Sequence, residues 1–212
     1  MMAADNNLTQ PLTILLWNAN GILKNINELQ ITLIEKTIDI AMISETHLTH
    51  NNFLNIHGYE TLRADHPDGT SHGGTALLIS NRIPHSLFPS HSSNKLQIIA
   101  SSIVLNSIPI SFASAYFPPG CLFLDNEFSI FLLSLDHTFI IGADFNAKHL
   151  KWGSRYTNTK GRSLLRVISS SHAKTLSPDS PTYWPTHVNR HPAILDFFIT
   201  NLPNHLKSQI TN

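Results

Sequence analysis

"FIIGADFNAKHLKWGS", residues 139 to 154, joins an apolar run directly to polar side chains. Phe139 to Ile141 are aromatic and β-branched residues, which favour the interior of a β-strand. Asp144 and Asn146 follow at once, where the strand meets its loop. A carboxylate and an amide in this position indicate a functional site, because a strand that served structure alone would seldom end in paired polar ligands.

The N-terminal part predicts a strand, a helix and a second strand. Residues 12 to 17, in "LTILLWNANG", are expected to form the first strand, and residues 40 to 44, in "DIAMISETHL", the second strand, which delivers Glu45 at its end. Apolar residues at helical spacing lie between them, namely Ile22, Ile26, Leu29 and Leu33.

The middle of the chain predicts antiparallel pairing. "GGTALLIS", "LQIIASSIVL" and "IPISFASAY" are short strand candidates, and Asn106 and Ser107 form a tight turn between the last two. A helix over residues 125 to 135, a second helix in "GRSLLRVISS" and a last strand over residues 195 to 200 complete the pattern. We expect an α/β fold with two mixed sheets packed face to face and helices outside.

Length and composition fit one domain. The chain has 212 residues, of which 42% are apolar, enough to fill a single core. We expect residues 1–10 to form a disordered tail and residues 11–212 to form the domain. The N-terminus lacks a secretory pattern and no apolar run is long enough for a membrane span, so we expect a soluble, intracellular protein that is not secreted.

Cys121 is the single cysteine, which excludes an internal disulfide and favours a reducing compartment. It follows a Pro-Pro-Gly turn and has no motif of a catalytic thiol.

The formal net charge is zero, so no global basic field attracts nucleic acid. A local basic run stands between residues 148 and 166, and it contains no acidic residue. The run is either a solvated helix face with its loop or a local contact for a polyanion. Its members are Lys148, Lys151, Arg155, Lys160, Arg162 and Arg166.

Polar residues stand at the ends of several predicted strands. Each of them has a plain structural alternative: Asn18 as a turn residue, Glu45 as a helix-cap partner and Tyr116 as a half-buried core aromatic. If the strands align, however, the whole set converges on one edge of the sandwich. The set consists of Asn18, Glu45, Tyr116, Asp144, Asn146 and Asp196.

These side chains are rich in oxygen ligands and include no cysteine and no clear histidine pair. This favours a hard cation, Mg²⁺ or Mn²⁺, over zinc. A carboxylate-held Mg²⁺ keeps waters and accepts phosphate oxygens, which points to phosphoester hydrolysis.

In this order, "LLWNANG", "ISETHL", "SAYFPPG", "GADFNAKHLKWGS", "PTYW" and "ILDFFIT" resemble the endonuclease/exonuclease/phosphatase superfamily, and within it the jockey-like endonuclease domains of non-LTR (LINE) retrotransposons. The resemblance runs from about Leu12 to about Leu202. It implies a DNase I-like four-layer α/β sandwich that nicks double-stranded DNA with Mg²⁺ and leaves a 3′-hydroxyl. It also implies a reverse transcriptase domain in the parent element and a nuclear location. We expect a monomer.

The resemblance also implies roles for single residues. Glu45 matches the main metal ligand, and Asn18 matches the amide that supports the metal site. Asp144 matches the residue that orients or deprotonates the attacking water, Asn146 positions the phosphate, and Tyr116 contacts the scissile phosphate. In the family the counterpart of Asp196 pairs with a histidine.

That histidine belongs to a Ser-Asp-His motif on a further strand, and no "SDH" occurs in this sequence. We therefore expect the domain to lack its last strand and Asp196 to lack its partner, with an exposed sheet edge as a consequence. His47 and His149 lie nearest the predicted site in sequence and are the candidates to replace the missing imidazole.

Further residues are candidates for contact with DNA. Lys148, Lys151 and Arg155 could hold phosphates beside the metal. His187 and His191 lie four residues apart, but Pro192 follows and no third zinc ligand accompanies them, so contact with the DNA backbone is the better interpretation. Three aromatic residues, Trp152, Tyr183 and Trp184, could stack or wedge at the DNA groove, although core packing is preferred for Trp152. The hydroxyl of Thr182, in "SPTYW", is either a turn group or part of the site.

Three functions remain open at this point. The first is a metal-dependent endonuclease of retrotransposon origin, and the second is a phosphatase on the same scaffold. The third is a catalytically impaired remnant that at most binds nucleic acid, and the absence of the Ser-Asp-His motif favours this possibility.

Overall fold

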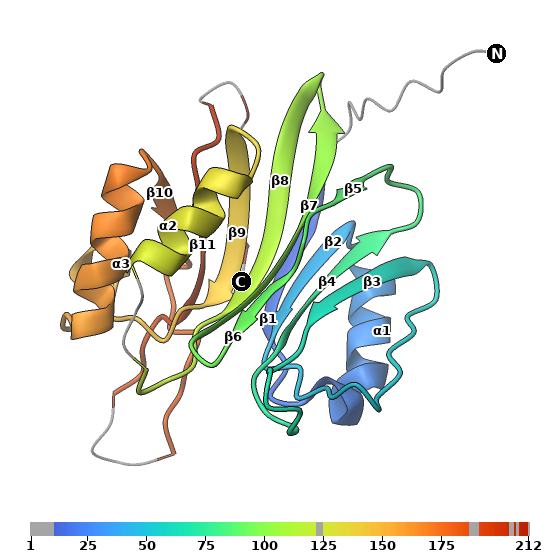
Figure 1. The fold of residues 1–212 in the computed structure, drawn as a ribbon, viewed down its shortest axis with the longest axis horizontal. Helices are drawn as coiled ribbons and strands as arrows, with labels where there is room; N and C mark the ends of the chain where they lie inside the picture. Colours follow the sequence, from blue (N-terminus) through green and yellow to red (C-terminus); the bar gives the residue numbers. More distant parts are fainter. Residues whose placement is uncertain (1–10, 122–124, 187–190, 204–205, 207, 212) are drawn as a thin grey trace.

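A computed structural model describes residues 11–121, 125–186, 191–203, 206 and 208–211. Two β-sheets pack face to face, and helices cover both outer faces, so that the molecule has four layers (Figure 1). The helices α2 (Asp125–Ser134) and α3 (Thr159–Ser170) lie on one side and α1 (Ile26–Glu35) on the other. The predicted four-layer α/β sandwich is confirmed.

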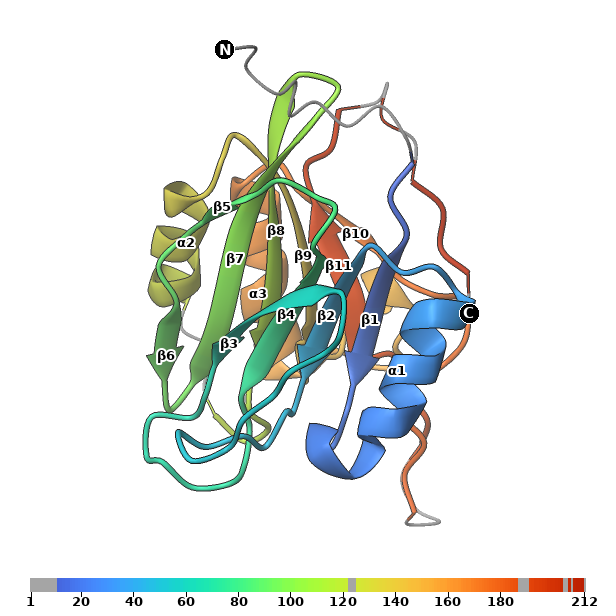
Figure 2. The same ribbon diagram turned by 90° about the vertical axis from the view of Figure 1, so that its right-hand side faces the viewer.

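The smaller sheet has the order β1-β2-β4-β3. Its strands are β1 (Ile14–Asn18), β2 (Ile40–Ser44), β3 (Tyr59–Ala64) and β4 (Thr75–Ser80). β1 and β2 are parallel, as the predicted strand–helix–strand unit requires, and α1 packs beside them (Figure 2). The predicted helix between them is split into a 3₁₀ turn η1 (Ile22–Asn25) and α1.

The larger sheet has the order β10-β11-β9-β8-β7-β5, and β6 pairs with β7 off this path. The strands are β5 (Ser86–Leu87), β6 (His91–Ser93), β7 (Leu96–Leu105), β8 (Ile108–Tyr116), β9 (Thr138–Asp144), β10 (Lys174–Leu176) and β11 (Asp196–Thr200). The predicted hairpin turn joins β7 to β8, and its residues Asn106 and Ser107 have φ values of 50° and 63°. Two left-handed residues in succession give the twist that a two-residue hairpin needs.

Alternation along single strands builds three apolar layers. On β2, Ala41 and Ile43 face α1, while Ile40 and Met42 face the larger sheet. On β9, Ile141 faces the layer of α2 and α3, while Ile140 faces the smaller sheet. Because successive side chains on a strand point to opposite faces, a strand covered on both faces is apolar throughout.

The two sheets approach closely at Gly142 on β9. A Cβ atom there would lie 2.7 Å from Met42 Sδ and 3.1 Å from Leu16 Cδ1. The glycine therefore lets β9 approach β1 and β2, and this packing fixes the strand ends of both sheets relative to one another.

Several short or half-exposed strands were not predicted from the sequence, namely β3, β5, β6 and β10. The residues of β3 are mostly of intermediate exposure, so the strand lacks the apolar run that marks a buried strand. Among the described residues, no helix has the length and apolar character needed to cross a membrane.

Candidate active site

The strand pairings bring the predicted polar residues to one edge of the sandwich. Tyr116 on β8 lies opposite Asp144 on parallel β9, and Asp196 on antiparallel β11 lies opposite Asp144 from the other side. A pocket of about 770 Å³ opens there. The residues that line it include Asn18, Glu45, Asp144, Asn146 and Asp196.

Asp144 is the centre of a hydrogen-bond network that joins the two sheets. Asn18 donates from Nδ2 to Asp144 Oδ2 at 2.9 Å, and Asn146 donates from Nδ2 to the same oxygen at 3.0 Å. The Asn146 backbone N–H donates to Asp144 Oδ1 at 3.0 Å. Three donors hold the carboxylate in one orientation, so it is preorganised before any substrate arrives.

The backbone is strained at several of these residues. Glu45, His47 and Asn146 have φ values of 52°, 54° and 47°. Asparagine tolerates this left-handed region, but glutamate and histidine adopt it rarely and at a cost. Such strain concentrates at functional sites, where the surrounding structure holds a side chain in a needed direction.

The pocket is strongly acidic. Burial raises the pKa of Asp144 well above its usual range, and the charges of Asp196 and Glu45 raise it further. Burial and the Glu45 charge raise the pKa of Asp196 to about 6. Among the lining residues that the structure describes, Lys148 is the one with a permanent positive charge. Three carboxyl groups thus share the pocket with Lys148.

Tyr116, opposite Asp144 on β8, is not among the residues that line the pocket and is 6% exposed. Burial raises its pKa, as do the charges of Glu45 and Asp144 and a hydrogen bond with Glu45. The phenol therefore stays protonated and acts as a hydrogen-bond donor rather than as a base.

A divalent metal ion fits this donor set. The donors are carboxylate and amide oxygens, which are the ligands of hard cations. Asp196 Oδ1 is buried and has no hydrogen-bond partner among the described residues. Because like charges disfavour ionisation of their neighbours, a cation between Glu45, Asp144 and Asp196 would relieve the repulsion that adds to the raised pKa values of Asp144 and Asp196.

Thr182 fixes the position of Asp196. Its hydroxyl accepts hydrogen bonds from the backbone N–H groups of Leu195 at 2.9 Å and Asp196 at 3.1 Å. The hydroxyl from "SPTYW" therefore belongs to the pocket wall and ties the start of β11 to the loop before it.

The basic run does not form one surface. Lys148 lines the pocket and donates from Nζ to the Tyr156 hydroxyl at 3.2 Å, whereas Lys151 and Arg155 are exposed outside the lining. Lys160 is buried and donates to the Pro118 carbonyl at 2.6 Å. Arg166 pairs with Asp125 on α2. The two last residues therefore stabilise the helical layer.

The histidines divide in a similar way. His149 accepts from the Lys151 backbone N–H at 3.0 Å and thereby caps the 3₁₀ turn η2 (Leu150–Trp152), so its Nδ1 is engaged. His47 Nε2 lies 3.6 Å from Glu45 Oε2, and His191 lines the pocket. His187, predicted to contact DNA, lies outside the described residues.

The aromatic candidates separate into core and rim. Trp152 is fully buried, donates to the Ala147 carbonyl and stacks on Phe197, which confirms its core role. Tyr183 lines the pocket, and Trp184 is 69% exposed beside it in sequence. Sequence reasoning did not single out four further lining residues, which are Asn20, Pro119, Tyr156 and Leu195. Asn20 and Pro119 stand in loops directly after strand ends, a position that could have marked them.

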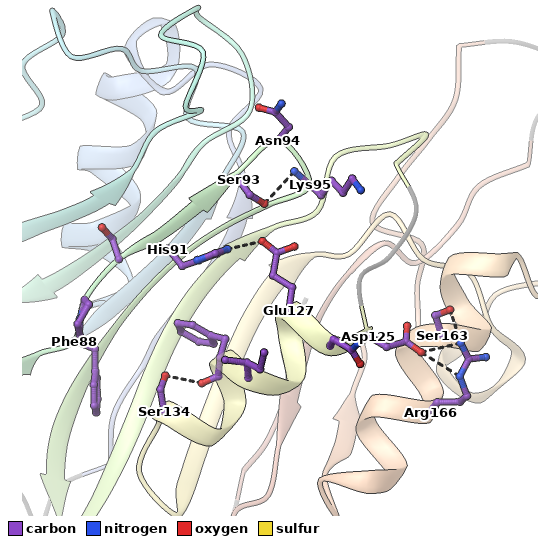
Figure 3. A pocket seen from close by; sticks show the side chains of 15 residues that line it. Phe88, His91, Ser93, Asn94, Lys95, Asp125, Glu127, Ser134, Ser163 and Arg166 are labelled. Atoms are coloured by element: carbon purple, nitrogen blue, oxygen red, sulfur yellow. Dashed lines mark hydrogen bonds and ion pairs between the residues drawn. The ribbon is translucent and has the colours of Figure 1, made fainter.

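A larger groove of about 1060 Å³ lies elsewhere, along β6 and α2 (Figure 3). Four of its titratable groups pair with one another: His91 faces Glu127, and Arg166 faces Asp125. None of the predicted site residues lines it, so the smaller acidic pocket is the candidate active site.

Comparison with known proteins finds relatives encoded by mobile elements. A family model described as endonuclease-reverse transcriptase matches residues 110–212. An RNA-directed DNA polymerase from the mobile element jockey of Drosophila melanogaster is 34% identical over 91% of this chain and 21% of its own length. A probable RNA-directed DNA polymerase from transposon X-element of the same species is 31% identical over 90% of the chain and 21% of its own length. The chain thus spans about a fifth of these relatives.

Solved structures show the same fold. The endonuclease domain of TRAS1, a telomere-specific non-LTR retrotransposon, superposes with a TM-score of 0.69 at 20% identity, covering 90% of this chain and 84% of that one. An AP endonuclease from Leishmania major gives a TM-score of 0.71 at 13% identity, covering 89% of this chain and 78% of that one. On the strength of the family match and the jockey relatives, the chain belongs to the endonuclease/exonuclease/phosphatase family, and it shares its fold with the endonuclease domain of a non-LTR retrotransposon.

Proposed function

We propose that the chain is a Mg²⁺-dependent endonuclease, with Mn²⁺ as a substitute, that hydrolyses one phosphodiester bond in a strand of double-stranded DNA and leaves a 3′-hydroxyl. One observation carries the proposal: Asp144 is clamped by Asn18 and Asn146 inside a pocket that also holds Glu45 and Asp196. Such an arrangement combines a preorganised carboxylate with the ligands of a hard cation.

In this proposal Glu45 is the main metal ligand and Asn18 supports the site. The bound cation would offset the charge that develops on the phosphate. Asp144 orients a water molecule and accepts its proton, and its raised pKa makes the ionised carboxylate a stronger base. The water oxygen forms the new bond to phosphorus, the bond to the 3′ oxygen breaks, and that oxygen leaves and takes up a proton.

Neutral donors complete the site. In this proposal Asn146, which lines the pocket, positions the phosphate, and Tyr116, held protonated, contacts it as a hydrogen-bond donor once it exchanges its bond with Glu45. Asp196 and Thr182 fix the opposite wall of the pocket. Among the described residues, His191 at the pocket and His47 beside Glu45 are the imidazoles proposed for proton transfer to the leaving group.

The features around the pocket favour DNA over a small phosphoester. Lys148 at the pocket can contact a phosphate, and Tyr183 and Trp184 are exposed aromatic groups that can stack on bases or enter a groove. The curated relatives are named as RNA-directed DNA polymerases of mobile elements. We therefore propose that a reverse transcriptase domain in the parent element extends the 3′-hydroxyl, and that the chain acts as a monomer in the nucleus.

Nicking of supercoiled plasmid by the purified chain in Mg²⁺ tests the proposal. Wild type should convert supercoiled plasmid to open circles, and so should the control variant Asp179→Ala, which alters an exposed residue that does not line the pocket. Asp144→Ala, and wild type in EDTA, should leave the plasmid supercoiled. The 3′ end should serve as a primer for an added polymerase, which a 3′-phosphate would prevent.

Other outcomes separate the alternative functions. Wild type that is as silent as Asp144→Ala, yet binds DNA with a salt-dependent affinity, would show an impaired remnant instead of an enzyme. Release of phosphate from phosphoinositides without plasmid nicking would show a phosphatase on this scaffold.

A further inference from the structure

A second group of metal-ligating side chains lies outside the pocket, in the loop "HPDGTSH" between β3 and β4. His66 Nδ1 lies 2.9 Å from Asp68 Oδ1, and His72 Nε2 lies 3.6 Å from Asp68 Oδ2. One ligand atom from each residue can be chosen so that all lie within 4.8 Å of one another. Both imidazoles are thus directed at one carboxylate.

Neighbouring groups hold the three side chains in this arrangement. The Thr70 backbone N–H and hydroxyl donate to Asp68 Oδ1 at 2.8 and 2.9 Å. The Thr70 hydroxyl also lies 2.6 Å from His72 Nδ1, which leaves Nε2 of that ring for the carboxylate side. In metal sites a ligating histidine commonly uses its second nitrogen for such a hydrogen bond.

Burial differs among the three residues in a way that suits a site filled from solvent. The His66 side chain is 7% exposed, whereas those of Asp68 and His72 are 44% and 51% exposed. The buried imidazole forms the floor, and the two exposed ligands leave a path for an ion and room for water. The His66 and His72 ring centroids lie only 3.9 Å apart, a separation compatible with two nitrogens bound to one ion.

We propose that His66, Asp68 and His72 bind a divalent transition-metal ion of the zinc class, with water completing the coordination. Two imidazole nitrogens and one carboxylate oxygen suit Zn²⁺, Co²⁺ or Ni²⁺, whereas Mg²⁺ prefers oxygen ligands alone. The site is therefore chemically distinct from the carboxylate and amide pocket around Glu45.

The ion would clamp the loop against the segment that carries Glu45. Gly73 and Gly74 follow directly after His72, and their carbonyls accept from the backbone N–H groups of His47 and Thr46. A Cβ at Gly73 would lie 3.2 Å from Tyr116 Cε1 and 3.5 Å from His66 Cδ2. In this proposal the three ligands act as positioning residues for this packing.

Zinc titration of the tag-free, chelator-treated chain tests the site, and excess Mg²⁺ in the buffer occupies the oxygen pocket. Wild type should bind one Zn²⁺ per chain by calorimetry, and Co²⁺ should give the absorption bands of a nitrogen- and oxygen-ligated ion. His72→Gln should weaken Zn²⁺ binding at least tenfold. His57→Gln, which alters an exposed histidine in another loop, should bind like wild type.

Thermal unfolding gives a second readout that needs no DNA and no activity, so its result is independent of the proposed nuclease. Zn²⁺ at about 100 times its Kd should raise the Tm of wild type and His57→Gln by about 5 °C or more, and that of His72→Gln by much less. Asp68→Asn, also at an exposed position, provides a second ligand variant if His72→Gln is poorly folded. The proposal is overturned if wild type shows no saturable Zn²⁺ binding, or if the ligand variants bind as tightly as His57→Gln.

Discussion

Asp144 and Asp196 lie directly opposite each other on the antiparallel strands β9 and β11. Opposed residues of a strand pair share one face of the sheet, so the two carboxyl groups meet in the same pocket. Burial first, and the nearby negative charges second, raise the pKa of each. The pair is therefore a source of instability in the metal-free protein at neutral pH and a source of affinity for a cation.

The raised pKa of Asp196 predicts a pH-dependent stability in EDTA. Since the folded-state pKa, about 6, exceeds the unfolded value, the stabilisation from protonated Asp196 is complete below about pH 4 and is lost as the pH rises through 6. Asp196→Asn removes this titration and should be more stable than wild type at pH 8 by about 1–2 kcal/mol, because partial exposure of the side chain reduces the full effect.

Thermal melts between pH 4 and 8 in EDTA measure this difference, which should vanish near pH 4. Asp179→Asn, at an exposed position, should follow wild type throughout. Parallel curves for wild type and Asp196→Asn across the whole range would contradict the prediction.

Asn18 should govern the protonation of Asp144 as well as its orientation. In Asn18→Ala the Asp144 Oδ2 atom loses one of its two amide donors, so the ionised form is less stabilised and the pKa rises further. The nicking rate at pH 7 should fall by about 10²-fold, and the acidic limb of the pH–rate profile should move to higher pH.

The matched control for that variant is Asn55→Ala, at an exposed loop position. It should keep both the rate and the profile of wild type. A slower Asn18→Ala enzyme with an unshifted profile would mean that the amide supports the fold or the metal but does not tune Asp144.

Gly161 should be needed for the position of Lys148. A Cβ atom added at Gly161 would lie 2.0 Å from the Lys148 carbonyl oxygen. Because this oxygen belongs to the backbone, a change of side-chain rotamer cannot remove the clash. Asn158 strengthens the same contact, because its Oδ1 accepts from the N–H groups of both Gly161 and Lys148. Despite the better helix propensity of alanine, Gly161→Ala should lower the free energy of unfolding by about 1–3 kcal/mol.

Denaturant unfolding measures this loss. Ser169→Ala, an exposed position of α3, should be neutral or slightly stabilising under the same conditions. Equal free energies of unfolding for the two variants would show that the loop at Lys148 can move to accommodate the added methyl group with little loss of stability.

Local patterns in the sequence predict the strands that carry the site, because each of these strands is an apolar run that is followed by a polar residue. Asp144 after Ile141 and Glu45 after Ile43 are visible in this way. The hairpin at Asn106 and Ser107 is equally local, since its turn residues tolerate positive φ.

The contacts between these strands are not local, and the sequence could not supply them. Asn18 and Asp144 belong to different sheets and lie 126 residues apart, so their hydrogen bond depends on how the sheets pack. The burial of Lys160, which donates to the Pro118 carbonyl, depends on tertiary packing, and a count of charged residues does not reveal it. The capping role of His149 likewise depends on where the 3₁₀ turn begins. The loop with His66, Asp68 and His72 did carry a signal, two histidines and an aspartate within seven residues.

Lys148 should contribute to DNA affinity through one phosphate contact. Within the described part of the pocket lining it is the one permanently charged cation, and the ring centroid of Tyr156 lies 5.0 Å from its Nζ. In an Asp144→Asn background, which prevents cleavage, Lys148→Ala should weaken binding of a short duplex and reduce the slope of log Kobs against log[salt] by about 0.9. Lys95→Ala, in the groove along β6, should leave the slope unchanged. Fluorescence anisotropy over a range of salt concentrations measures both slopes. An unchanged slope for Lys148→Ala would mean that the DNA backbone does not contact Lys148. The exposed residues Lys151 and Arg155 would then be the next to substitute.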